Sequence, residues 1–300
     1  MAIQAAHIGS FFYEVEATYG AGFAVGQQEI PSDSVTSVGF TPSMNIKRLP
    51  TINDYDYQGT CAGAHDYTVN LEHNFQELKA ATQHIATTCL EYLAVNRTAG
   101  DLGSICAALK TGAAAWTVLK GGKINTQTIT FAIGAPITVS TELWFNNLTE
   151  VGTVPTGTTP GAIGTAFDTF NGSMFTRAAK WIAGIKSATL TSNNNLERIP
   201  RINTTTAQGG DYSLIMPGIQ DVNLKVDIIA DSAGLNDITD LITDPLTTTI
   251  LQTGATAAIC LKWTLTKPSF NSQPLVYSAD MTTLIISADM GAETFAEAVV

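Results

Sequence analysis

The chain has 300 residues, a length that favours two ordinary domains but also fits one large domain. Hydrophobic residues make up 45%, which is enough for a core, whereas charged residues make up only 14%. Soluble proteins usually carry roughly 25% charged residues, so the scarcity of charge indicates that other subunits cover much of the surface. The net charge of −11 excludes tight binding to phosphate backbones, which depends on basic side chains.

The sequence predicts neither a membrane span nor a signal peptide. No apolar run reaches the roughly 18 to 20 residues that a membrane-spanning helix needs. The N-terminal Met1–His7 lacks a basic segment followed by an apolar one. The four cysteines are Cys61, Cys89, Cys106 and Cys260, and none forms a CxxC pair. They are interpreted as mostly buried thiols of a protein made in a reducing cytoplasm.

In chain order, the first half is predicted to contain strands, one helix and further strands. Strands are expected over Phe11–Ala17 and over Ser37–Ile46, which is rich in alternating small and apolar residues. A helix is expected over Gln76–Val95, where apolar residues recur near helical spacing. Strict alternation then predicts a strand over Ile137–Phe145.

A segment rich in glycine, proline and threonine follows, over Asn146–Asn171. One interpretation is a flexible linker between two domains. The other is a long loop that docks on a neighbouring subunit, because Ile163, Phe167 and Phe170 are too apolar for a free linker.

The second half repeats this order of elements. A weaker helix is expected over Leu235–Leu251, interrupted by Pro245, and a strand over Ile259–Leu265. The predicted fold class is therefore α+β, mainly β, with a dominant antiparallel sheet. Its two units are expected at residues 1–150 and 151–300.

The division into two units is based on an internal sequence repeat at an offset of 150 residues. Residues 37–53 match residues 187–203 at seven positions. The identical pairs are Ser37/Ser187, Thr41/Thr191, Asn45/Asn195, Arg48/Arg198, Pro50/Pro200, Ile52/Ile202 and Asn53/Asn203. A second match, of Val69–Glu72 with Val222–Lys225, follows in the same order at an offset of 153. A tandem duplication explains both.

The repeated motif contains Asn193–Asn195, which would suit a turn. The matched position in the first copy is Met44, which is no turn former. The motif is therefore assigned to a strand that runs into a bend at Pro50 and at Pro200.

No arrangement of residues predicts an active site or a metal site. Cysteines and histidines gather at Cys61, His65, His73, His84 and Cys89. Zinc sites use pairs of ligands two to four residues apart, and only Cys61 and His65 come near that spacing. Asp54–Gly59 resembles the start of a calcium loop, but His65 stands where the loop needs a glutamate. We therefore expect no cofactor and no catalysis.

Two arginines, Arg48 and Arg198, occupy matched positions of the repeat. An arginine beside apolar residues is usually the partner of a local carboxylate. In a ring it could equally bridge two subunits, so the prediction is structural pairing and not ligand binding.

The segment Ile185–Glu197 resembles a stretch of the major tail tube proteins of tailed phages and related archaeal viruses. In that family a strand of alternating Ser/Thr and apolar residues ends in a run similar to Asn-Asn-Leu-Glu. Asp221–Val226 and the helix expected after it also stand where the family has them. The resemblance covers residues 180–265. The first copy departs from it, with Ser43-Met44 in place of Asn193-Asn194 and Lys47 in place of Glu197.

The resemblance implies a small β-sandwich or barrel flanked by a helix, which forms rings of six units that stack into a DNA-conducting tube. A duplicated chain would complete such a ring with three copies. The expected partners are other copies of the chain, other tail proteins and translocating DNA without tight binding, in a virion tail made in the host cytoplasm. No membrane is expected. Three chains would carry a net charge of 3 × −11 = −33, which suits a lumen past which DNA slides.

The residues expected at contacts between units or subunits are Arg48, Arg198, Asn195, Glu197, Ile163, Phe167 and Phe170. The alternative function is a secreted surface-layer or adhesin-like β-sandwich, which would call for a signal peptide.

Overall fold

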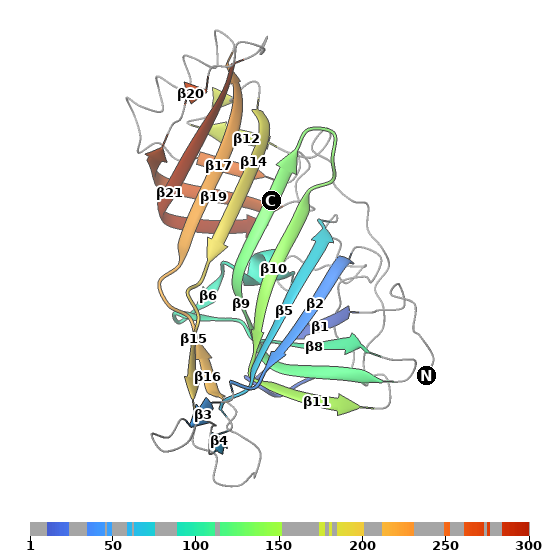
Figure 1. The fold of residues 1–300 in the computed structure, drawn as a ribbon. Coiled ribbons are helices and arrows are strands. Elements are labelled where there is room, and N and C mark those ends of the chain that lie inside the picture. Colours follow the sequence, from blue (N-terminus) through green and yellow to red (C-terminus); the bar gives the residue numbers. More distant parts are fainter. Residues whose placement is uncertain are drawn as a thin grey trace.

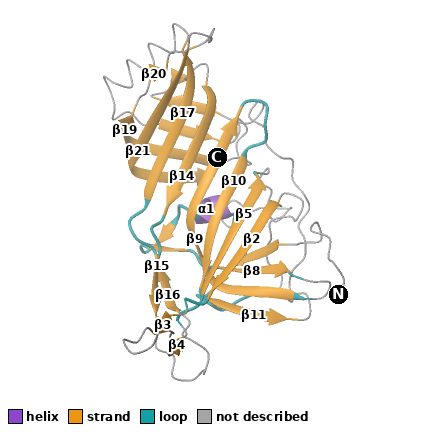
Figure 2. Ribbon diagram, in the orientation of Figure 1, coloured by secondary structure: helices purple, strands orange, loops and turns teal. Residues whose placement is uncertain are grey.

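The computed structural model describes residues 11–23, 35–45, 47–49, 59–61, 63–75, 89–111, 115–151, 174–177, 180–181, 185–200, 212–230, 249–252, 261–272, 275–276 and 284–299. Strands dominate these residues, and the described helix is one turn long, α1 (Leu90–Leu93) (Figure 2). The expectation of a mainly β protein is confirmed.

The first half of the chain, as the term is used below, ends with β11. Its strands are β1 (Phe11–Val15), β2 (Val35–Ser43), β3 (Lys47–Leu49), β4 (Gly59–Cys61), β5 (Asp66–Asn74), β6 (Arg97–Thr98), β7 (Asp101–Leu102), β8 (Ile105–Lys110), β9 (Trp116–Ala132), β10 (Thr138–Phe145) and β11 (Asn147–Val151).

The second half begins with β12. Its strands are β12 (Met174–Arg177), β13 (Lys180–Trp181), β14 (Ile185–Asn193), β15 (Glu197–Pro200), β16 (Tyr212–Met216), β17 (Asp221–Ala230), β18 (Thr249–Gln252), β19 (Leu261–Ser272), β20 (Leu275–Val276) and β21 (Leu284–Val299).

A single curled antiparallel sheet runs through both halves (Figure 1). Its strand order is β13-β12-β18-β19-β21-β17-β14-β9-β10-β5-β2. The pairs β15–β16, β3–β4 and β6–β7 form separate two-stranded ribbons. The halves are therefore joined edge to edge through β9 and β14.

The 17-residue strand β9 belongs to two layers of the first half. Its beginning pairs with β8 and β11, and its end pairs with β10 and β14. The change of direction falls at Gly121, which has a φ of 62°, and at Gly122, where a Cβ would overlap the ring of Phe145. Glycine lets the strand bend over this ring at no steric cost.

Alternation along the strands separates a buried face from a polar face, as expected for an antiparallel sheet with one face on the core. Ile137, Val139, Leu143 and Phe145 are at most 1% exposed, which confirms the predicted strand and its period. One core cluster fills the space between the layers of the first half, including Phe11, Leu71, Leu90, Leu119 and Phe145. A second cluster crosses the junction of the halves, including Ile129, Phe131, Leu190, Leu224 and Trp263.

Three predictions of local structure are wrong. The bend of the repeated motif lies at Asn45 and Asn195, whose φ angles are 43° and 47°, and Pro200 ends the next strand instead. The last part of the second predicted helix, Thr249–Leu251, is the strand β18. Asn147–Val151, assigned to the loop, is the strand β11.

Other predictions fall wholly or partly outside the described residues. Of the first predicted helix, Gln76–Thr88 lies outside, and α1 covers part of the remainder. Pro50, residues 231–248 and the part of the loop that holds Ile163, Phe167 and Phe170 also lie outside.

Candidate assembly site at the junction of the two halves

The halves meet through a strand pair, in which Ser187–Asn193 of β14 runs antiparallel to Thr126–Ala132 of β9. Seven consecutive residues of each strand are in register, from Ser187 opposite Ala132 to Asn193 opposite Thr126. The hydroxyls of Thr128 and Thr191 lie 3.4 Å apart across the pair. The junction is thus a continuation of the sheet and not a loose contact between domains.

The buried residue Asn194 closes this junction at the end of β14. Its side-chain Nδ2 donates to the carbonyl oxygens of Ala94, at 2.8 Å, and Ile124, at 3.0 Å. It is 0% exposed, so these bonds replace those it would make with water. Both acceptors belong to the first half.

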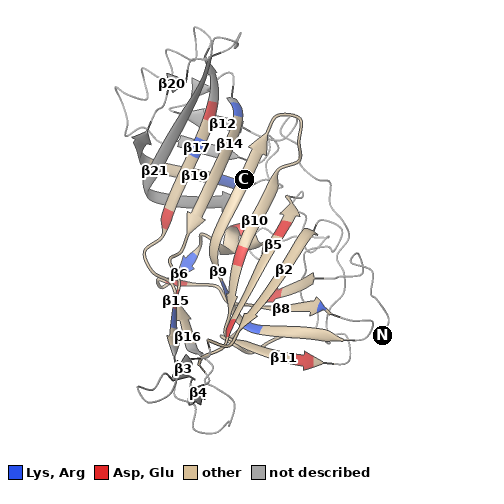
Figure 3. Cartoon of the chain, in the orientation of Figure 1, with Lys and Arg blue, Asp and Glu red and all other residues tan. Residues whose placement is uncertain are grey.

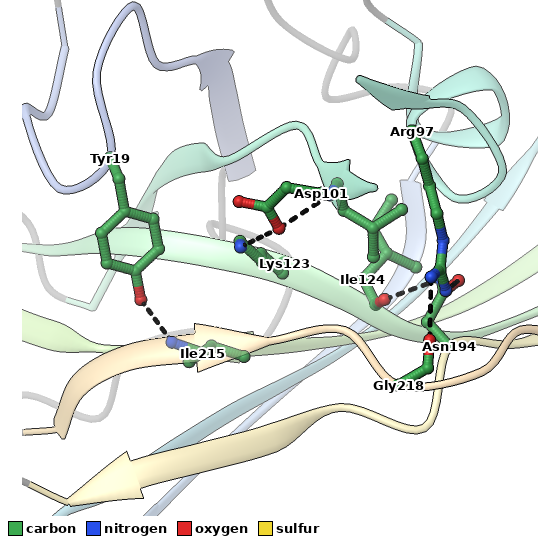
Figure 4. A network of polar contacts seen from close by, with 9 residues as sticks. Tyr19, Arg97, Asp101, Lys123, Ile124, Asn194, Ile215 and Gly218 are labelled. Carbon is green, nitrogen blue, oxygen red and sulfur yellow. Dashed lines mark hydrogen bonds and ion pairs between the residues drawn. The ribbon is translucent and has the colours of Figure 1, made fainter. Parts of the chain in front are cut away.

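Arg97 of the first half also binds Asn194 and the nearby backbone of Gly218 (Figure 4). Its Nη2 donates to Oδ1 of Asn194 at 3.1 Å, and its Nη1 donates to the carbonyl oxygen of Gly218 at 2.8 Å. Desolvation lowers the pKa of the guanidinium. The contact links the start of the β6–β7 ribbon to two separate segments of the second half.

Asn125 supplies the backbone partner, because a β-bulge frees it from the ladder. The register of β9 with β10 shifts at this residue. Its carbonyl oxygen accepts the N–H of Asn194 at 2.7 Å, and its Oδ1 accepts the N–H of Leu196 at 3.1 Å. Its own Nδ2 donates to Glu142 at 3.1 Å, which fixes the orientation of the amide.

The β15–β16 ribbon of the second half packs on the first half through apolar and polar contacts. Leu196 and Ile215 form a buried cluster with Leu102, against which Trp144 packs. The N–H of Ile215 donates to the hydroxyl of Tyr19 at 3.0 Å (Figure 4). Burial raises the pKa of Tyr19 to about 12.

Arg198, one of the predicted contact residues, lies in this ribbon and reaches the first half. Its guanidinium carbon is 4.1 Å from the ring centre of Trp144, and its Nη1 is 3.4 Å from a carboxylate oxygen of Asp66. Its Nη2 donates to the hydroxyl of Thr68 at 3.2 Å. A planar guanidinium suits this combination of a ring face and a carboxylate.

The buried ammonium of Lys123 pairs with Asp101 beside the same ribbon (Figure 4). The nitrogen also lies 5.3 Å from the ring centre of Tyr19. The lysine side chain is 1% exposed and the carboxylate is 57% exposed. The positive charge of this pair is therefore buried, and its negative charge lies at the surface.

Two corners of the chain share one geometry. Asn195 has a φ of 47° and donates from Nδ2 to the carbonyl oxygen of Ile219 at 2.8 Å. Asn45 has a φ of 43° and donates in the same way to Ala64 at 2.9 Å. Asparagine is among the few residues that adopt positive φ readily.

A glycine sits against each asparagine backbone. A Cβ on Gly218 would lie 2.6 Å from the carbonyl oxygen of Asn195, and a Cβ on Gly63 would come still closer to that of Asn45. Each corner therefore needs both an asparagine and a glycine.

The polar face of the sheet crosses the junction without interruption. One row of residues, paired strand to strand, consists of Ser37, Glu72, Ser140, Thr128, Thr191 and Asn223. On one side, the next row of the same face holds Thr138, Thr130, Thr189 and Lys225, and on the other side it holds Glu142, Thr126, Asn193 and Asp221. Charged residues are sparse along the central strands (Figure 3). In these three rows, the carboxylates of Glu72, Glu142 and Asp221 outnumber the ammonium group of Lys225 by three to one.

The remaining predicted site residues are placed as follows. Glu197 is exposed on β15, next to Arg198. Arg48 lies in β3, opposite Thr60 of β4. Within the described residues, no group of three metal-binding side chains is close enough to hold an ion. His73 instead pairs with Glu91 at 2.7 Å in the core, and Cys89 and Cys106 are buried thiols outside any disulfide.

Sequence reasoning missed the residues that carry the junction, Arg97, Asn125, Asn194 and Gly218. The usable signal was the Gly-x-x-Asp pattern, which occurs as Gly63–Asp66 and Gly218–Asp221 at an offset of 155. Strand register agrees with this offset, since Ser43 faces Asp66 and Asn193 faces Asp221. This offset differs by two residues from the offset of 153 at which Val69–Glu72 match Val222–Lys225.

Comparisons with protein-family models and with curated proteins found no match to this chain. In the part of the chain that the structure describes, no helix has the length and apolar character to cross a membrane.

Proposed function

We propose that this chain is a tandem duplication of one tail-tube-like β unit and serves as a structural subunit of a viral tail tube. Three copies form a ring of six units, and stacked rings form a conduit for DNA delivery. The role is non-catalytic, and the partners are further copies, other tail proteins and DNA that passes without tight binding. The protein resides in the virion tail.

The order of strand pairing supports the duplication. In the first half the pairs run β1-β8-β9-β10-β5-β2, and in the second half they run β12-β18-β19-β21-β17-β14. Matched strands also follow one another in the same order along the chain. The two Asn–Gly corners occupy matched places in this order, since each follows the first strand of the pair β2–β5 or β14–β17.

A matched bulge supports it further. The register of β9 with β10 shifts at Asn125, and the register of β19 with β21 shifts at Asn271. The two asparagines begin related segments, Asn125-Thr126-Gln127 and Asn271-Ser272-Gln273, at an offset of 146. A bulge is a specific backbone feature that unrelated strands share only by coincidence.

The observation that carries the ring is the pairing of β14 with β9. It extends the sheet of one proposed unit into the next by a regular ladder of seven residue pairs. A sheet edge left open invites further pairing, and closure into a ring removes every open edge. A chain of two units makes one such strand pairing internally, between β14 and β9, and each ring contact between chains needs one more.

The polar face supports the role as a conduit. Hydroxyl groups hold water without attracting phosphate, and the excess of carboxylates along this face repels DNA. The net charge of −11 acts in the same direction. In the proposed ring this face lines the channel.

Electron microscopy of the purified protein tests the proposal. Stacked rings or tubes with a central channel wide enough for duplex DNA are the expected result. A protein that stays monomeric at high concentration, in low and high salt, would overturn it. Antibodies against the chain should also label the tail of purified virions, and labelling of the capsid alone would contradict the assignment.

A further inference from the structure

The outer edge of β2 is open, whereas the matched strand β14 is covered. In the described parts of the chain, β2 pairs with β5 only, and β14 pairs with both β17 and β9. Exposure differs accordingly at matched positions. Val38 is 38% exposed and Ala188 is 3% exposed, and Met44 is 60% exposed where Asn194 is 0% exposed. Among the described strands, β9 covers the edge of β14, and no strand covers the matching edge of β2.

The matching acceptor edge belongs to β19. Its beginning pairs with β18 at Lys262–Leu265, as the beginning of β9 pairs with β8. No described strand pairs with Asn271–Ser272 on the side away from β21, the position at which β14 meets β9. Among the described strands, the first half therefore ends in a donor edge without a partner strand, and the second half ends in an acceptor edge without one.

We propose that β2 of one chain pairs with β19 of a second copy in the register of β14 with β9, and that Arg48 of the first chain pairs with Asp221 of the second. This inference rests on the proposed duplication. It assigns the contact between chains to named residues.

The register follows from the offsets of 150 for β2 and 146 for β9. Asn193 faces Thr126 inside the chain, so Ser43 faces Ser272 of the second copy. Asn194 donates its N–H to Asn125, so Met44 donates its N–H to Asn271.

One hydrogen bond of the ladder is lost between chains. Backbone N–H groups alternate between the two sides of a strand, so Ser192 points its N–H to β9 as Asn194 does. The matched residue is Pro42, which has no N–H. Proline at this place protects the edge of a free chain from indiscriminate pairing.

The ion pair follows from the offset of 150 between Arg48 and Arg198 and the offset of 155 between Asp66 and Asp221. Arg198 faces Ile215 in its ribbon and Arg48 faces Thr60 in the matched ribbon. Arg198 lies 3.4 Å from Asp66, and the residue matched to Asp66 is Asp221.

Asp221 lies in a region suited to being covered. It is exposed, and Ile219, two residues before it, is 86% exposed, the largest value among the exposed apolar residues described. An isoleucine left so open beside an exposed carboxylate fits a surface that a second copy covers with an arginine and a strand edge.

The contact between chains is weaker than the internal junction. Met44 cannot make the side-chain bonds that Asn194 makes to Ala94 and Ile124, and it cannot accept one from an arginine as Asn194 does from Arg97. Rings therefore dissociate into folded chains before the halves of a chain separate.

A charge exchange tests the ion pair. Arg48→Glu and Asp221→Arg should each raise the concentration for half-assembly about tenfold, because like charges then face each other across the contact. The double variant should return to within about threefold of the wild type, measured by sedimentation velocity. Lys47→Glu is the matched control, with the same change of charge one position away, and should leave assembly within about threefold of the wild type.

A cross-link tests the strand register. Chains with Ser43→Cys are mixed with chains with Ser272→Cys and oxidised. Ser43 and Ser272 would form a non-hydrogen-bonded pair, whose close Cα atoms suit a disulfide. With Cys61 and Cys260 replaced by serine in both chains, a covalent dimer should appear in the mixture and in neither variant alone, while the buried Cys89 and Cys106 stay unreacted.

The outcomes separate the two proposals. Assembly that responds neither to the charge exchange nor to the cross-link would overturn this contact and leave the tube proposal standing. A chain that never assembles would overturn both. A cross-linked contact in an assembly without rings would support the contact and contradict the tube.

Discussion

The guanidinium of Arg97 donates a 3.1 Å hydrogen bond to the side-chain oxygen of Asn194, 97 positions further along the chain. The same asparagine donates to the carbonyl oxygens of Ala94 and Ile124. This buried amide therefore satisfies three groups of the first half at once. It fixes where the second half begins, because a strand shifted by one residue would break all three hydrogen bonds.

Replacing Asn194 should destabilise the chain strongly. Asn194→Ala removes three hydrogen bonds of a buried amide, to Ala94, Ile124 and Arg97, at a cost of about 2–4 kcal/mol in the free energy of unfolding. Asn193→Ala, at the partly exposed neighbouring position, should cost under about 1 kcal/mol. Urea denaturation followed by circular dichroism measures both, and equal losses would contradict the role of Asn194.

The two corner glycines should be equally intolerant of a side chain. Gly218→Ala and Gly63→Ala each force a Cβ against an asparagine carbonyl, with an expected loss of about 2–3 kcal/mol. Gly39→Ala is the control, because the nearest atoms to its Cβ would lie 3.9 Å away. Thermal unfolding of the three variants tests the prediction. A tolerated alanine at either corner would show that the backbone there relaxes freely.

Arg198 should contribute through its stacking as well as its charge. Arg198→Ala should cost about 1–2 kcal/mol, and Arg198→Lys should recover only part of it, because lysine cannot stack flat on Trp144. A change in tryptophan fluorescence should accompany both variants. Glu197→Ala, at the exposed neighbouring position, should stay within about 0.5 kcal/mol of the wild type. Full recovery by lysine would contradict the stacking.

Tyr19 should make the ribbon contact sensitive to alkaline pH. Burial raises its pKa to about 12 in the folded chain, above the ordinary value of 10.0. The folded chain thus holds this proton more tightly than the unfolded chain does. The resulting stability is complete below pH 10 and is lost as the pH rises through 12.

Comparison with Tyr19→Phe isolates this effect from the other tyrosines. The variant leaves the N–H of Ile215 without its acceptor, which should cost about 1–2 kcal/mol at pH 8. The difference between wild type and variant should shrink between pH 10 and pH 12 in urea denaturation. A difference that stays constant across this interval would contradict the assigned titration.

The sequence predicted the sheet better than the corners. Alternation along Ile137–Phe145 identified a strand because the period of two is a local property. The turn at Asn193–Asn195 was rejected because Met44 stands at the matched position. The positive φ falls at Asn45 and at Asn195, one residue after Met44 and after Asn194, so the methionine was no argument against a turn.

The junction itself could not be predicted from local pattern. Asn125 acts through a bulge, and Arg97 acts through contacts with residues about a hundred positions away. Neither residue belongs to a periodic motif. The last residues of the helix predicted to end at Leu251 form β18 instead, because pairing with β19 overrides a weak helical period.

The mass of the smallest closed assembly tests the central claim most directly. Native mass spectrometry of the purified protein should show a ring of three chains, 3 × 31.7 = 95.1 kDa, since each chain supplies two units. A closed ring of six chains, or a chain that remains at 31.7 kDa under all conditions, would contradict the account.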